Sequence, residues 1–180
     1  MSTLDGGKMM NPSAELSRLV NLDKLYKRGL EYSLKATPAE MVALAQRFKI
    51  VAVQNLTANY LIEPGRTPYQ GYSLIASLKA EAVQSCVATL VDVQEEIETQ
   101  FELQVIDQKY EGQPLEEAYQ DEDIEYSDGG NIDLGEITAQ YLALSLNPYP
   151  RSAKSLEEEK VKESIENNEK RNPFSILKTL

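Results

Sequence analysis

The residues in this chain that are best suited to chemistry are carboxylates, and they fall into two clusters. The clusters consist of Glu96, Glu98 and Glu102, and of Asp121, Glu122, Asp123, Glu125 and Asp128. Paired carboxylates can act as general acid and base, and oxygen ligands at alternate positions suit Ca²⁺. However, Tyr126 stands where the tight-turn glycine of an EF-hand loop belongs. We therefore interpret both clusters as solvated acidic surface and predict no catalytic residue, metal or cofactor.

The chain has one cysteine, Cys86, and no histidine. A Ser-His or Cys-His nucleophile is therefore impossible, as is any zinc or iron site that needs a histidine ligand. No disulfide can form within the chain, which fits a reducing compartment. Because no histidine can activate it, Cys86 is expected to be a small buried side chain. We predict that the protein is not an enzyme.

The formal charge of −11 is concentrated in one section of the chain. Residues 1–90 carry 7 acidic and 10 basic side chains, and residues 137–180 carry 6 and 7. Residues 91–136 carry 16 acidic side chains and a single base, Lys109. This uneven distribution says more about binding than the total charge does.

A modest basic patch could form within the first 70 residues, and nucleic-acid binding requires such a footprint. Its candidate members are Lys24, Lys27, Arg28, Arg47 and Lys49, with Arg66 nearby and with Tyr26 and Tyr69 available to stack on bases. Similar spacing also occurs on ordinary solvated surfaces. Direct RNA binding therefore stays open as an alternative function.

The elements that would position these residues begin with two short strands and a helix. Residues 16–22 and 29–35 have the composition of strands. Thr37 and the proline after it supply an N-cap and a first helical residue, and Glu40 supplies a carboxylate at N3. These residues predict a helix that ends near Lys49.

From residue 50 the hydrophobic period changes to two, which predicts long antiparallel strands with one buried and one wet face. Residues 56–62, 72–82 and 93–105 alternate in this way. In the last of them one face is expected to carry Gln94, Glu96, Glu98, Gln100, Glu102 and Gln104. The alternation falters over residues 84–90, as at a bulge or a tight connection. Residues 107–131 are predicted to be a long acidic loop.

A second helix is predicted after this loop. Asp133 stands at the N-cap and Glu136 follows three residues later, which predicts reciprocal capping. The helix should stop at residues 147–150, because Pro148 and Pro150 cannot continue it. Its apolar face is expected to consist of Leu134, Ile137, Tyr141 and Leu144.

These elements predict an α+β fold: an antiparallel sheet, open or curved into a partial barrel, with two main helices packed on it. We expect a mobile N-terminus over residues 1–13 and a domain over residues 14–151. Residues 152–180 are expected to form a charged tether with an apolar docking segment at its end, which binds either its own domain or a partner. The absence of a membrane-length apolar run and of a signal or transit segment predicts a bacterial cytoplasmic protein.

Two motifs flank the second helix: Asn-Ile-Asp-Leu-Gly-Glu at residues 131–136 and Leu-Asn-Pro-Tyr-Pro-Arg at residues 146–151. Together with residues 36–40, 44–47, 80–90 and 172–174, they resemble the YceD family, the large ribosomal RNA subunit accumulation proteins, in the form found in alphaproteobacteria. The resemblance runs from about residue 30 to residue 151 and resumes at residues 172–177. Its motif residues include Cys86, Thr89, Asp133, Leu134, Gly135, Glu136, Pro148, Tyr149, Pro150 and Arg151.

The resemblance implies a role in the accumulation of large-subunit ribosomal RNA, without known catalytic residues. Many family members read Cys-x-Arg-Cys-Leu around this cysteine, which suggests a metal site. Thr89 replaces the second cysteine here, so we predict no metal. Because large-subunit ribosomal proteins are basic, we expect the acidic residues to bind such a protein or an assembly factor. Ribosomal RNA is the alternative partner, and neither a membrane nor a small-molecule substrate is expected.

Overall fold

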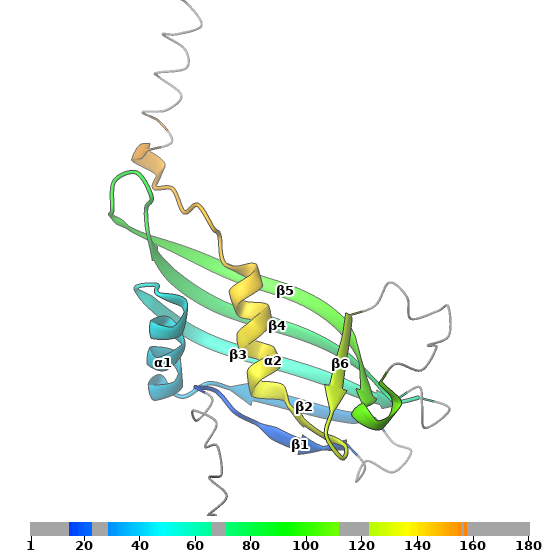
Figure 1. Ribbon diagram of the computed structural model, residues 1–180. Helices are drawn as coiled ribbons and strands as arrows, with labels where there is room; N and C mark the ends of the chain where they lie inside the picture. The colour runs from blue at the N-terminus through cyan, green and yellow to red at the C-terminus, as the bar shows by residue number, and fades with distance from the viewer. Residues whose placement is uncertain (1–14, 23–28, 66–70, 112–122, 156, 158–180) are drawn as a thin grey trace, which may run out of the picture.

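A five-stranded sheet forms the centre of the computed structural model, which describes residues 15–22, 29–65, 71–111, 123–155 and 157 (Figure 1). The strand order is β2-β3-β4-β5-β6. The strands are β2 (Leu30–Lys35), β3 (Ala52–Pro64), β4 (Tyr72–Ser85), β5 (Asp92–Asp107) and β6 (Asp123–Ser127). A 3₁₀ turn, Gln108–Tyr110, follows β5.

Two helices, α1 (Pro38–Phe48) and α2 (Leu134–Ser145), lie across the same face of this sheet (Figure 1). The strands β2 to β5 pair antiparallel, whereas β6 runs parallel to the end of β5. The sheet stays open and does not close into a barrel (Figure 1). The predicted α+β class is confirmed, with one parallel pairing that the alternation pattern did not indicate.

The first predicted strand is shorter than expected and joins a different partner. Only β1 (Leu19–Asn21) is extended, and it pairs antiparallel with β7 (Asn131–Asp133) in a separate two-stranded sheet. Leu16 and Leu22, at the ends of the predicted strand, are fully buried. Their burial fixes this segment against the rest of the fold, and sequence periodicity carries no information about which strand becomes its partner.

The prediction of one long acidic loop over residues 107–131 is wrong, because β6 and the start of β7 lie within it. Asp123 and Glu125 alternate with Ile124 and Tyr126 in β6, so the strand holds few apolar residues. Its stability comes from backbone pairing with residues 103–107 of β5, a long-range contact that composition does not reveal. Residues 112–122 lie outside the described parts of the chain.

The hydrophobic core fills the space between the sheet and the helices. Tyr60, on β3, is only 2% exposed, and its hydroxyl donates to the carbonyl of Leu134 at 3.0 Å and lies 2.7 Å from the Thr138 hydroxyl. Burial raises the pKa of Tyr60. The bond joins the middle of the sheet to the first turns of α2. The fully buried strand residues around it include Leu56, Ala58, Ile62, Leu74 and Leu78.

Both helices begin as their sequences predict, although α2 differs in detail. Thr37 and Glu40 form the complete capping box of α1, and Lys49 ends the helix in the left-handed conformation. Asp133 caps α2 by accepting the N–H groups of Gly135 and Glu136, but the Glu136 side chain turns away from the cap.

The predicted apolar face of α2 is wrong at Leu144, which is 79% exposed. Thr138 and Leu142 are fully buried instead. The helix crosses the sheet so that this side contacts the core. Helical periodicity defines a stripe but leaves its final rotation to packing.

The faltering alternation over residues 84–90 is the tight connection between β4 and β5. The N–H of Cys86 donates to Val91 at 2.8 Å, and the N–H of Leu90 donates back to Cys86 at 2.9 Å. Leu90 adopts the left-handed conformation, with φ of 59°, to close the turn. Cys86 is fully buried, as expected.

Candidate interaction surface

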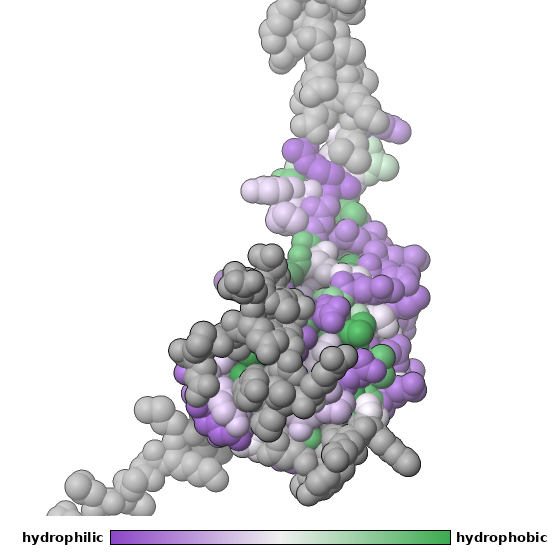
Figure 2. Space-filling model, turned by 90° about the vertical axis from the view of Figure 1, so that its right-hand side faces the viewer, coloured by the Kyte–Doolittle hydropathy of each residue, from purple (hydrophilic) through white to green (hydrophobic). Residues whose placement is uncertain are grey.

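The side of the main sheet turned away from α1 and α2, which we call the open face, is the candidate interaction surface. No described helix or strand covers it. Strand registers place its side chains in rows, such as Glu31, Leu61, Ile75 and Glu102, and the next row of Ser33, Asn59, Ser77 and Gln100. Figure 2 views the molecule from the β6 side, and the margin that corresponds to this face is mainly hydrophilic.

The open face is acidic. Glu96, Glu98 and Glu102 are exposed and lie together on it, as the alternation of β5 predicted. Among the described residues, the charged side chains of this face are Glu31, Glu63, Glu81, Asp92, Glu96, Glu98 and Glu102 with Lys35 and Lys79. Lys79 pairs with Glu98 across β4 and β5 at 2.7 Å, which leaves the remaining carboxylates in large excess. The surface therefore favours a positively charged partner.

Two shallow hollows shape this face. One, of about 440 Å³, lies over β2, β3 and β4 and includes the exposed pair Leu61 and Ile75. The other, of about 450 Å³, lies further along the strands between Asn55, Lys79 and Glu96. Apolar contact in the first hollow and charge in the second would suit a partner that carries both basic and apolar side chains.

The second acidic cluster does not belong to the open face. The parallel register places Asp123 beside Leu103 and Glu125 beside Val105, on the helix-covered side. Tyr141 of α2 donates to Asp123 at 2.9 Å, and burial raises the pKa of this tyrosine to about 12. Asp128 lies in the turn before β7, and Asp121 and Glu122 fall outside the described residues. The structure thus separates residues that the sequence grouped together.

The predicted basic patch is represented by two described residues. Arg47 forms a two-bonded ion pair with Glu136, at 2.7 and 2.8 Å, and also contacts Glu15 at 3.2 Å. These partners raise the pKa of Arg47, and Arg47 in turn lowers the pKa of Glu136. Lys49 is exposed at the end of α1. Lys24, Lys27 and Arg28 lie outside the described residues.

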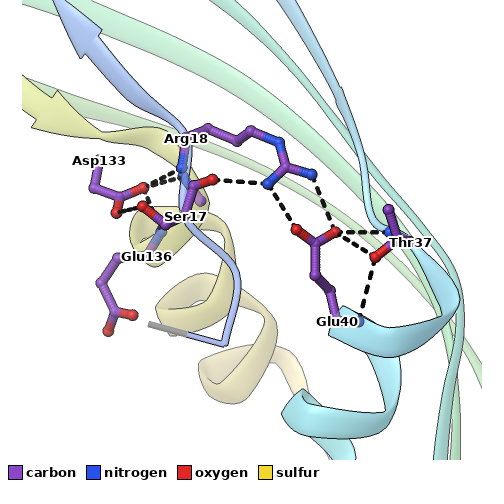
Figure 3. Close-up of polar contacts among 7 residues, drawn as sticks. Ser17, Arg18, Thr37, Glu40, Asp133 and Glu136 are labelled. Carbon is purple, nitrogen blue, oxygen red and sulfur yellow. Dashed lines mark hydrogen bonds and ion pairs between the residues drawn. The ribbon is translucent and has the colours of Figure 1, made fainter. Parts of the chain in front are cut away.

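The motif residues at the start of α2 hold the N-terminal segment in place (Figure 3). Asp133 accepts the hydroxyl of Ser17 and the backbone N–H of Arg18, each at 2.6 Å, while it caps the helix. A Cβ at Gly135 would lie 2.7 Å from the carbonyl oxygen of Leu16, so only glycine permits this close approach. Asp133 and Gly135 therefore have a structural role in this chain.

Arg18 extends this junction to the first helix (Figure 3). Its guanidinium donates to both carboxylate oxygens of Glu40, at 2.7 and 3.0 Å. These bonds from Arg18, assisted by Thr37, lower the pKa of Glu40 to about 2. A single N-terminal segment is thus tied to the first turns of both α1 and α2. Sequence analysis missed this ion pair, because no local pattern links residues 22 positions apart.

The second motif returns the chain to the β4–β5 connection. The carbonyl of Pro150 accepts the N–H of Val87 at 2.9 Å, and the carbonyl of Asn147 accepts the Gln84 side chain at 3.0 Å. Pro150 is buried, whereas Pro148 and Tyr149 are exposed. The motif therefore fixes the path of the chain after α2.

Cys86 and Thr89, the two positions of the family cysteine motif, meet residues that follow this segment. The N–H of Ser152 donates to the Cys86 sulfur at 3.3 Å, and Thr89 lies 3.4 Å from the Ser152 hydroxyl. Hydrogen bonds from Thr89 and then from Ser152 and Ser155 lower the pKa of Cys86 to about 5. Within the described ranges, no group of three or more His, Cys, Asp or Glu side chains could hold a metal ion.

The sequence prediction placed Gln100 on an exposed face but did not extend that face to the neighbouring strands. The residues it omitted are Leu61, Ile75, Ser33, Asn59 and Ser77. The signal was present, because these residues alternate with the buried ones in β2, β3 and β4. Assigning the outward residues of all four strands, and not only those of β5, would have predicted the face.

Comparison with known proteins identifies the chain's relatives. The family model described as "Large ribosomal RNA subunit accumulation protein YceD" matches residues 74–180, which is more than half of the chain. The match begins in β4 and includes β5, both motifs around α2 and the end of the chain. Searches of curated proteins and of solved structures find no match.

The described helices are all too short or too polar to cross a membrane. The family's description names large-subunit ribosomal RNA accumulation as the role and mentions no catalytic activity. The motifs, their structural contacts and the family match agree, and the chain belongs to the YceD family of large ribosomal RNA subunit accumulation proteins.

Proposed function

We propose that this protein is a non-enzymatic ribosome-biogenesis factor of the bacterial cytoplasm. It supports accumulation of large-subunit ribosomal RNA by binding a basic ribosomal protein or assembly factor through the open face. The observation that carries the proposal is the excess of carboxylates on a sheet face that no described element covers. Glu96, Glu98 and Glu102 provide the central contacts.

The charge of the open face supports a protein partner over direct RNA binding. Phosphate groups would be repelled by these carboxylates. Of the two described members of the basic patch, Arg47 already has Glu136 and Glu15 as partners. A basic protein, by contrast, would gain attraction from the same surface and associate faster at low salt.

Two matched triple variants test the proposal. The first is Glu96→Gln, Glu98→Gln and Glu102→Gln on the open face. The second is Asp123→Asn, Glu125→Gln and Asp128→Asn, which lie outside the open face, and both variants remove three negative charges. We expect the first to weaken capture of basic large-subunit proteins from a ribosome-assembling lysate by about tenfold, and the second by much less.

Salt dependence provides the second readout. Partner capture should fall as ionic strength rises, because exposed charges are screened. Capture that is insensitive to salt, or that survives neutralisation of the three open-face glutamates, would reject the proposal. Direct RNA binding would be favoured instead if purified ribosomal RNA bound with a steep salt dependence. This binding should then be lost when five basic residues are changed to Ala: Lys24, Lys27, Arg28, Arg47 and Lys49.

A further inference from the structure

Among the described residues, one backbone edge of β5 has no partner over most of its length. β4 pairs with β5 from Asp92 to Val105, but β6 pairs only with residues 103–107. No backbone hydrogen bond from any described residue reaches the other edge of residues 92–102. We call this eleven-residue stretch the free edge; in Figure 1 it runs along the sheet from the β4–β5 connection to the point where β6 begins.

An exposed strand edge of this length is a template for another strand, because alternate residues direct their N–H and C=O groups outward. Proteins commonly protect such edges with charge. The free edge carries Asp92, Glu95, Glu96, Glu98 and Glu102 and no basic residue. Two copies paired through this edge would bring like charges together, which is destabilising. A strand that carries basic side chains would instead be attracted to the carboxylates of the free edge.

The side chains on both sides of the free edge define what the incoming strand should look like. On the open face it would meet Glu96, Glu98 and Glu102. On the covered face it would meet the half-buried Glu95 and then Ile97 and Phe101. Tyr141 of α2 stacks on Phe101 with ring centroids 3.6 Å apart.

Leu144 extends this apolar side, because it follows Tyr141 by three residues and therefore lies on the same side of α2. It is 79% exposed, so it offers an uncovered apolar surface one turn from Tyr141. An incoming strand that alternates basic and apolar residues would match both sides, since successive side chains point to opposite faces.

We propose that the free edge of β5 binds an extended segment of alternating basic and apolar residues from the protein partner, as an added strand of the main sheet. This inference rests on the proposed function and specifies how the basic partner is held. Backbone hydrogen bonds would supply affinity, and the carboxylates would select the charge. The outer strands of the sheet, β2 and β6, span only six and five residues, and β2 also carries a base, Lys35, so both offer shorter edges than the free edge of β5.

The test uses the full-length chain and a synthetic twelve-residue peptide of alternating lysine and valine. Amide hydrogen exchange, followed residue by residue by NMR, is measured with and without the peptide. Every second amide within residues 92–102 should exchange at least tenfold more slowly in its presence. The matched control peptide is N-methylated at its four central residues, which keeps every charge and removes backbone donors on both edges. It should bind about tenfold more weakly and leave the exchange rates unchanged.

Three results would overturn the inference: absence of peptide binding, equal binding of both peptides, or slow exchange of these amides in the free chain. The last result would mean that another part of the chain or a second copy already covers the edge. If these outcomes occur while lysate capture still depends on the open-face glutamates, strand addition fails and the proposed function stands. If strand addition is observed but capture ignores those glutamates, the proposed function fails separately.

Discussion

The two faces of the main sheet are formed by the same strands but have different roles. Along β4, Leu74, Ala76 and Leu78 are buried under the helices, whereas Ile75, Ser77 and Lys79 point to the open face. The covered face is apolar and closely packed. The open face keeps charge, hydrogen-bonding groups and one exposed apolar pair available to a partner. Strand alternation therefore lets one element stabilise the fold and present a surface.

The comparison also separates two kinds of charged residue. At the junction of the N-terminal segment with α1 and α2, each carboxylate has a specific partner: Asp133 binds Ser17 and Arg18, and Glu40 binds Arg18. On the open face, carboxylates greatly outnumber bases. Charges that stabilise the fold are paired in defined geometry, and charges suited to binding are left in excess.

The largest contrast is expected between neighbouring residues of β4. Leu74→Ala should lower the free energy of unfolding by about 3 kcal/mol, because it opens a cavity at a fully buried site. Ile75→Ala, at a site that is 42% exposed, should cost less than about 1 kcal/mol. Urea denaturation of both variants measures the difference. Equal losses would mean that the open face is packed against something.

Asp133→Ala should have the next largest effect on stability. It removes the α2 cap and the acceptor for Ser17 and Arg18, so we expect a loss of about 2 kcal/mol. Asp133→Asn keeps an acceptor oxygen and should lose less. Thermal unfolding of the pair tests this order, and partner capture by the folded Asp133→Ala protein should be unchanged. Reduced capture at full folding would instead place this motif residue in the interface.

The Arg18–Glu40 pair predicts a dependence of stability on pH. Because Arg18 lowers the pKa of Glu40 to about 2, below its unfolded value of about 4.3, its contribution is present above about pH 4.5. It is lost as pH falls towards 2. Solvent screens the partly exposed pair, so we expect about 1–2 kcal/mol. In the Glu40→Gln variant, the decrease in unfolding free energy from pH 5 to pH 2 should be smaller by that amount. An unchanged slope would contradict the predicted contribution of this pair.

The smallest effect is expected for the ion pair on the open face. The side chains of Lys79 and Glu98 are 62% and 66% exposed, so their coupling should be below about 0.5 kcal/mol. A double-mutant cycle of Lys79→Ala and Glu98→Ala measures it. Lys79→Ala should nevertheless strengthen capture of a basic partner, because it removes one of the few bases on this face. A coupling above about 1 kcal/mol would show that the open face contributes to stability as the covered face does.

Several features of the structure could be predicted from local sequence. Thr37 and Glu40 defined the start of α1, and the alternation through β5 placed Glu96, Glu98 and Glu102 on one exposed face. Of the β5 residues expected to be exposed on this face, only Gln104 is buried, at 6% exposure, near the point where β6 pairs with β5. Local rules succeed here because capping and strand alternation involve residues a few positions apart.

What the sequence by itself determined is therefore the α+β class, the ends of α1, the start of α2 and the acidic face of β5. Tertiary structure alone decided that β1 pairs with β7, that β6 lies parallel to β5, and that Asp123 and Glu125 point away from the open face. It also decided that Arg18 pairs with Glu40 and that Leu144 stays exposed. The physical reason is that these outcomes depend on contacts between segments that are far apart in the sequence. Backbone pairing uses groups that nearly every residue has, so local residue patterns do not indicate which segments pair.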